Sequence, residues 1–68
     1  MVWFFTRGSE SLRVETRYDN ATDEYVLIAP GENGDTRTER FKSAHGFRTR
    51  LQALERRLRS DHWIAPAV

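Results

Sequence analysis

The feature that most constrains this fold is a change of hydrophobic period partway along the chain. Over residues 12–18, uncharged side chains alternate with charged ones, as in a strand with one buried and one solvated face. Beyond residue 43 the spacing changes to four, three and four residues, at Phe47, Leu51, Leu54 and Leu58. Such positions share one side of a helix. The chain therefore combines strands with a helix that packs on them.

Turn-forming residues divide the chain before this helix into four strands. Gly, Pro, Asn, Asp and Ser, which favour turns, gather in the segments 8–10, 19–23 and 30–35. The predicted strands cover about residues 2–7, 11–18, 24–29 and 36–41. The fourth strand has Phe41 as its one large apolar residue, so we expect it at an edge of the sheet, where charges are tolerated.

A helix is predicted over about residues 44–60. Ser43 is a suitable N-cap, because its hydroxyl can accept a hydrogen bond from a free backbone N–H in the first turn. Arginines gather near the other end, where the helix dipole favours positive charge. Beyond the helix we expect Trp63 to fold back onto the core and residues 64–68 to form a tail that frays from Ala65 onward.

Together these elements predict one α+β domain spanning residues 1–68. It is a four-stranded antiparallel β-meander followed by one amphipathic C-terminal helix packed on one face of the sheet. The core must be thin, because a domain of ~60 residues buries only about 60% of the surface that its unfolded chain exposes. The chain contains no cysteine, so disulfides and thiolate metal sites cannot add stability. We therefore expect packing against a second copy to contribute.

One helix covers one face of a sheet and leaves the other face open. We expect the uncovered face to form a homodimer interface or to bind another protein, because aromatic and arginine residues are enriched at interfaces. The residues assigned to this interface are Trp3, Phe5, Arg13, Arg17 and Tyr25. A competing interpretation is that the three aromatic residues complete the core of the monomer, with arginine stems lying over them.

The alternative function is binding of single-stranded nucleic acid. Residues 1–35 contain seven acids and three arginines, whereas residues 36–68 contain eight basic residues and three acids. Arginines neutralise phosphates and aromatic rings stack on bases. The candidate basic residues are Arg37, Arg40, Lys42, Arg48 and Arg56. However, acids alternate with the arginines along the strands, and cross-strand ion pairs explain this mixture without a ligand. A protein partner is therefore the preferred hypothesis.

The sequence offers little for catalysis. The chain has two histidines, His45 and His62, the residue type most suited to acid–base catalysis, and neither belongs to a catalytic or metal-binding motif. We expect no enzymatic activity, no cofactor and no bound metal. The apolar run at residues 1–5 is too short for the core of a signal peptide, and no segment approaches the ~20 apolar residues of a membrane span. We therefore expect a cytoplasmic protein without membrane contact.

Five short stretches spread over most of the chain carry a resemblance to other proteins. They are Glu15-Thr16-Arg17-Tyr18-Asp19-Asn20, Tyr25-Val26-Leu27, Glu39-Arg40-Phe41, Leu54-Glu55 and Trp63. These stretches resemble small uncharacterised bacterial proteins of about this length. The resemblance implies a bacterial cytoplasmic protein of unknown function, and it brings no catalytic or binding residue to this chain.

Overall fold

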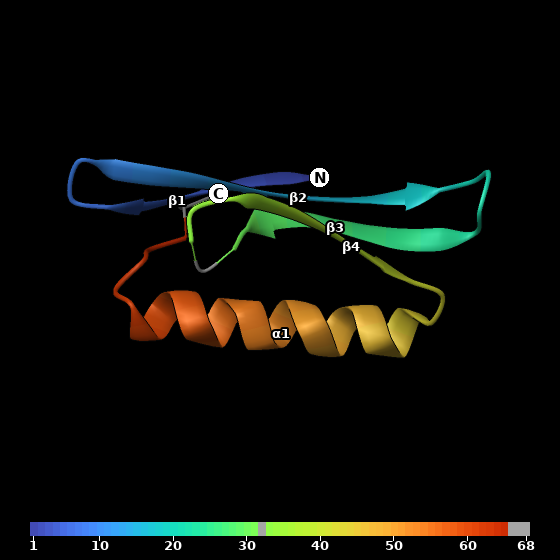
Figure 1. Ribbon diagram of the computed structural model, residues 1–68. Helices are drawn as coiled ribbons and strands as arrows, with labels where there is room; N and C mark the ends of the chain where they lie inside the picture. The colour runs from blue at the N-terminus through green and yellow to red at the C-terminus, as the bar shows by residue number, and fades with distance from the viewer. Residues whose placement is uncertain (32, 66–68) are drawn as a thin grey trace.

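The computed structural model describes residues 1–31 and 33–65, which form one sheet and one helix (Figure 1). The elements in chain order are β1 (Val2–Arg7), β2 (Glu10–Asp19), β3 (Glu24–Pro30), β4 (Thr36–Phe41) and α1 (Ala44–Ser60). Neighbouring strands are antiparallel and lie in the order β1-β2-β3-β4. The predicted α+β fold, an antiparallel meander with a C-terminal helix on one face, is confirmed.

Local chemistry fixes the turns that separate the first three strands. Gly8 has a φ of 60°, which glycine adopts without steric cost, and it forms the tight turn between β1 and β2. Between β2 and β3, the carboxylate of Asp19 accepts a hydrogen bond from the N–H of Ala21 at 2.9 Å. The hydroxyl of Tyr18 donates to the carboxylate of Asp23 at 3.2 Å. These short-range bonds explain why the turns were visible in the sequence.

The strand register assigns alternate residues to the two faces of the sheet. Trp3 lies opposite Val14, and Thr16 lies opposite Leu27. As a result, the odd-numbered residues of β1, β3 and β4 and the even-numbered residues of β2 share the face that packs on α1. The other face has no helix over it, and its members include Val2, Phe4, Arg13, Arg17, Val26, Ile28 and Arg40.

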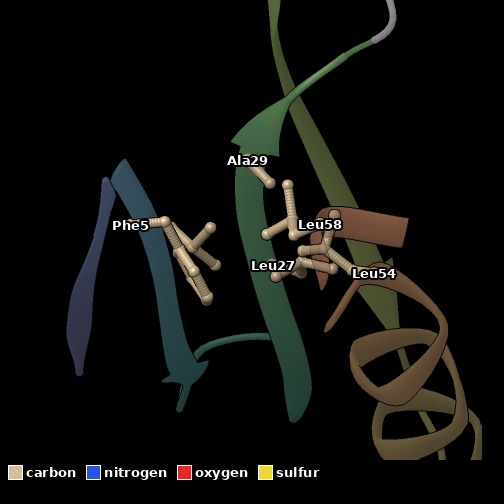
Figure 2. Close-up of a cluster of buried hydrophobic side chains, with 6 residues drawn as sticks. Phe5, Leu27, Ala29, Leu54 and Leu58 are labelled. Atoms are coloured by element: carbon tan, nitrogen blue, oxygen red, sulfur yellow. The ribbon is translucent and has the colours of Figure 1, made fainter. Parts of the chain in front are cut away.

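Helix α1 begins at the predicted cap and packs through the predicted stripe. The N–H of Gly46 donates to the hydroxyl of Ser43 at 3.1 Å. Leu54 and Leu58 are buried, and the other two members of the stripe pack against the core. Figure 2 shows both leucines beside Leu27 of β3. The backbone of α1 lies next to β3 and β4, so the helix covers half of its sheet face.

The chain reverses direction immediately after α1. His62 has a φ of 67°, a left-handed conformation that is uncommon for residues other than glycine. Its N–H donates to the carbonyl of Arg59 at 3.0 Å, and the N–H of Trp63 donates to the carbonyl of Leu58 at 2.9 Å. These two bonds form a Schellman motif. The turn brings Trp63 back against the core, as the sequence analysis predicted.

The segment that follows Trp63 is not wholly a tail. Ile64 and Thr6 exchange two backbone hydrogen bonds, with N···O distances of 2.8 and 3.0 Å, and form an antiparallel bridge on the outer edge of β1. The prediction that the tail begins at residue 64 was therefore wrong by one residue, because an open strand edge offered partners for the backbone of Ile64. Residues 66–68, for which fraying was predicted, lie outside the described part of the chain.

Candidate functional site

Three of the five residues predicted for an uncovered interface lie on the face that α1 covers. Phe5 is buried, Trp3 packs against the core, and Tyr25 stacks on Phe47 of α1 with ring centroids 5.1 Å apart. The placement of Trp3, Phe5 and Tyr25 on the uncovered face was wrong, because residues 2–5 are all apolar and show no alternation. The register of β1 with β2 decides the face instead. These aromatic residues complete the core of the monomer.

The uncovered face carries Arg13 and Arg17, together with apolar residues that the sequence analysis did not assign to it. Phe4 is 53% exposed, and Val2 is 41% exposed. Arg13 forms an ion pair with Glu15 at 2.7 Å. This face is therefore apolar along β1 and charged along β2.

Two residues on the outer edge of β1 have no backbone partner among the described residues. Met1 and Thr16 exchange backbone hydrogen bonds of 2.6 and 2.8 Å, so the odd-numbered residues of β1 direct their backbone groups toward β2. The even-numbered residues direct theirs outward, and those of Thr6 are bonded to the segment after α1. Within residues 1–31 and 33–65, the outward N–H and C=O groups of Val2 and Phe4 have no backbone partner.

The opposite edge of the sheet is charged. Residues 36–40 of β4 are threonines and charged side chains only. Arg40 pairs with Asp19 at 3.0 Å and with Glu24 at 3.6 Å. Charged side chains on an edge strand discourage the addition of another strand. Of the two edges, β1 is therefore the one suited to pairing.

An apolar groove lies on the covered face beside β1. Because α1 lies under β3 and β4, a cavity of about 360 Å³ remains between the helix and the other half of the sheet. Its lining includes Trp3 and Phe5 of β1, Leu51 and Leu54 of α1, and Trp63. The sequence analysis did not predict this groove, since the lateral position of a helix across a sheet leaves no local pattern in the sequence.

The five basic residues considered for nucleic-acid binding do not gather on one surface. Arg37 and Arg40 lie on opposite faces of β4, and Arg40 is engaged by two carboxylates. Lys42 lies in the connection to α1, while Arg48 and Arg56 are exposed on the helix itself. The structure therefore forms no continuous basic surface from these residues.

Among the described side chains, two have altered acidity, and both lie at the end of β2, beside the turn to β3. Partial burial, together with the neighbouring Asp23 carboxylate, raises the pKa of Tyr18. A hydrogen bond from Arg40, with a second from the N–H of Ala21, lowers the pKa of Asp19. Neither side chain lines the groove. These shifts reflect the packing of the hairpin rather than a site for proton transfer.

The described residues gather no group of three His, Cys, Asp or Glu side chains that could hold a metal ion. No helix in this part of the chain is both long enough and apolar enough to cross a membrane. Comparison of the chain with protein-family models, with curated proteins and with solved structures found no match.

Proposed function

We propose that the protein is a small non-enzymatic interaction module that self-associates by pairing β1 with β1 of a second copy. The observation that carries this proposal is the contrast between the two edges of the sheet. β4 is charged, whereas Val2 and Phe4 of β1 are apolar and exposed. The backbone N–H and C=O groups of these two residues point away from β2. Proteins protect edges that must remain unpaired with charges or prolines. Residues 1–6 contain neither.

The geometry of the edge selects one register for this pairing. A two-fold axis through Trp3 places Val2 of each copy opposite Phe4 of the other, and each of these pairs can exchange two backbone hydrogen bonds. The paired segment then spans residues 1–5 and ends before Thr6, whose outward groups already bond to Ile64. A register that places the two Phe4 residues opposite each other would need the groups of Thr6, and it is therefore disfavoured.

The same register buries the exposed apolar side chains of β1. On the uncovered face, Val2 and Phe4 of one copy contact Phe4 and Val2 of the other, and full burial of such side chains contributes ~1.5–3 kcal/mol each. On the opposite face, the two Trp3 side chains become neighbours at the apolar groove. Because the paired segment is short, we expect a weak dimer that dissociates on dilution.

Light scattering over a concentration series at two salt concentrations tests the proposal. We expect a dimer that forms at high protein concentration and resists salt, because apolar contacts and backbone hydrogen bonds are little screened. The variant Phe4→Lys should remain folded and monomeric, since it places two ammonium groups in the paired segment. Thr38→Lys adds the same charge to an exposed position of β4 and should leave the dimer unchanged.

A wild-type chain that stays monomeric at all concentrations would contradict the proposal, and so would a Phe4→Lys variant that still dimerises. The alternative function, binding of single-stranded nucleic acid, predicts a different pattern. In that case the mass would rise only when an oligonucleotide is added, and the complex would weaken steeply with salt as counterions are released. The dispersion of the five candidate basic residues over separate surfaces favours the protein partner.

A further inference from the structure

We infer that a cavity beside β4, the strand at the other edge of the sheet, binds a small dianionic phosphate. The cavity has a volume of about 170 Å³ and lies where β4 and the end of β3 meet α1. Its charged lining residues are Arg37 and Glu39 of β4 and Arg50 and Arg57 of α1. Counted over the described lining residues, three positive charges against one negative charge give a net charge of +2.

Two of the arginines are held in place by bonds that use only part of their donor capacity. The Nε of Arg50 donates to both carboxylate oxygens of Glu39, at 3.0 and 3.2 Å. One terminal nitrogen of Arg57 donates to the carbonyl of Pro30 at 3.4 Å. Because a guanidinium carries five N–H donors, both side chains retain donors for a ligand. Because these bonds already restrict the two side chains, the arginines would lose less conformational entropy when a ligand binds.

The third arginine, Arg37, lies in space that is free because Gly31 has no Cβ atom. A Cβ atom at Gly31 would lie 2.8 Å from Nε of Arg37 and 3.0 Å from its Cδ. The side chain of Arg37 therefore lies directly against the backbone at the end of β3. This contact brings a guanidinium from β4 to the same cavity as the two from α1.

The number of arginines at this cavity exceeds what internal ion pairing explains. Elsewhere on the sheet, Arg7, Arg13 and Arg40 each pair with a carboxylate, whereas Arg17 has no ion pair among the described residues. At the cavity, the described lining residues include three arginines and one carboxylate, that of Glu39. Like charges held together repel, and a bound anion with two charges would neutralise the excess.

The size and shape of the cavity fit a phosphate group. A cavity of about 170 Å³ has room for a phosphate group, which has five heavy atoms. The planar fork of a guanidinium matches two phosphate oxygens, which makes arginine a preferred ligand for this group. Inorganic phosphate and small phosphate monoesters share this chemistry.

The test is a titration of the ¹⁵N-labelled full chain with inorganic phosphate near neutral pH, followed by NMR, with sodium chloride of equal ionic strength as reference. We expect saturable shifts of the Gly31 amide and of the arginine Nε–H signals. Binding of a phosphate monoester should weaken as the pH falls below ~6, where the monoester takes up its second proton. O-phosphoserine, titrated in parallel, distinguishes a monoester ligand from the free ion, and binding of either one supports the inference.

Two variants of neighbouring residues provide the matched comparison. Arg57→Gln removes a charge from the cavity and should weaken binding about tenfold, as expected for the loss of one charged hydrogen bond. Arg56→Gln removes the same charge from an exposed residue that does not line the cavity and should leave binding unchanged. If Arg57→Gln unfolds the chain, Arg37→Gln serves instead, because Arg37 is exposed.

Three results would overturn the inference. The first is the absence of saturable shifts beyond those produced by chloride, and the second is equal weakening by the variants of Arg56 and Arg57. The third is equally strong binding of dimethyl phosphate, which would indicate a site for phosphodiesters such as the nucleic-acid backbone. The inference is independent of self-association, so the monomeric Phe4→Lys variant should bind phosphate as the wild type does.

Discussion

At the scale of single residues, His62 is one of two described residues other than glycine with a positive φ. It adopts a φ of 67° at the position after α1 where helices most often place glycine. A left-handed conformation costs an L-residue with a Cβ roughly 1–2 kcal/mol. The cost is offset by the Schellman bonds, which direct Trp63 onto the core and Ile64 onto β1. His62 is therefore a position where the tertiary structure overrides local preference.

Replacement of this histidine should stabilise the fold. His62→Gly relieves the left-handed strain, and after subtraction of the greater backbone entropy of glycine in the unfolded chain we expect a gain of about 0.5–1 kcal/mol. Urea denaturation followed by circular dichroism measures the change. His62→Ala is the control, because alanine keeps the Cβ and should give no gain. A His62→Gly variant no more stable than His62→Ala would show that the turn carries no strain.

At the scale of elements, α1 depends on one cap at its start. The Ser43 hydroxyl accepts the N–H of Gly46, and no acidic residue lies in the first turn to interact with the helix dipole. The other end is already favourable, with Arg57 and Arg59 in the last turn. The N-terminal end is thus the weaker end of the helix.

Substitutions at the cap should separate hydrogen bonding from charge. Ser43→Ala should destabilise the fold by about 1 kcal/mol, because it leaves an N–H of the first turn without its partner. Ser43→Asp should retain the hydrogen bond and add a favourable interaction with the dipole. Chemical denaturation of both variants beside the wild type gives the comparison. Equal stability of the alanine and serine forms would mean that the cap is replaced by water at no cost.

At the scale of the whole molecule, one thin core supports two layers. The cluster of buried residues joins Leu54 and Leu58 of α1 to three strands, while the groove beside β1 leaves part of the apolar surface open. A chain of 68 residues has little stability to spare. Pairing through β1 would supply contacts that the monomer lacks.

Stability should therefore depend on protein concentration. Only folded chains can pair, so a higher protein concentration favours the folded dimer. The melting temperature of the wild type should therefore rise with protein concentration. The melting temperature of Phe4→Lys should stay constant over the same range. Calorimetry at several concentrations measures both. A wild-type melting temperature that does not change with concentration would count against self-association in the folded state.

The sequence by itself determined the elements and their order. Alternation over residues 12–18 identified β2, and the turn segments placed the remaining strands within one residue of their observed ends. The stripe of Phe47, Leu51, Leu54 and Leu58, with the Ser43 cap, identified α1. These signals are local, because each depends on residues that are neighbours in the chain or one helical turn apart.

Only the tertiary structure decided which surfaces remain for function. The apolar residues 2–5 carry no alternation, so the pairing of Trp3 with Val14 was needed to bury Trp3 and Phe5 and to expose Val2 and Phe4. The groove and the arginine cavity likewise depend on where α1 crosses the sheet. Register and helix placement arise from contacts between residues distant in sequence, and no local pattern encodes them.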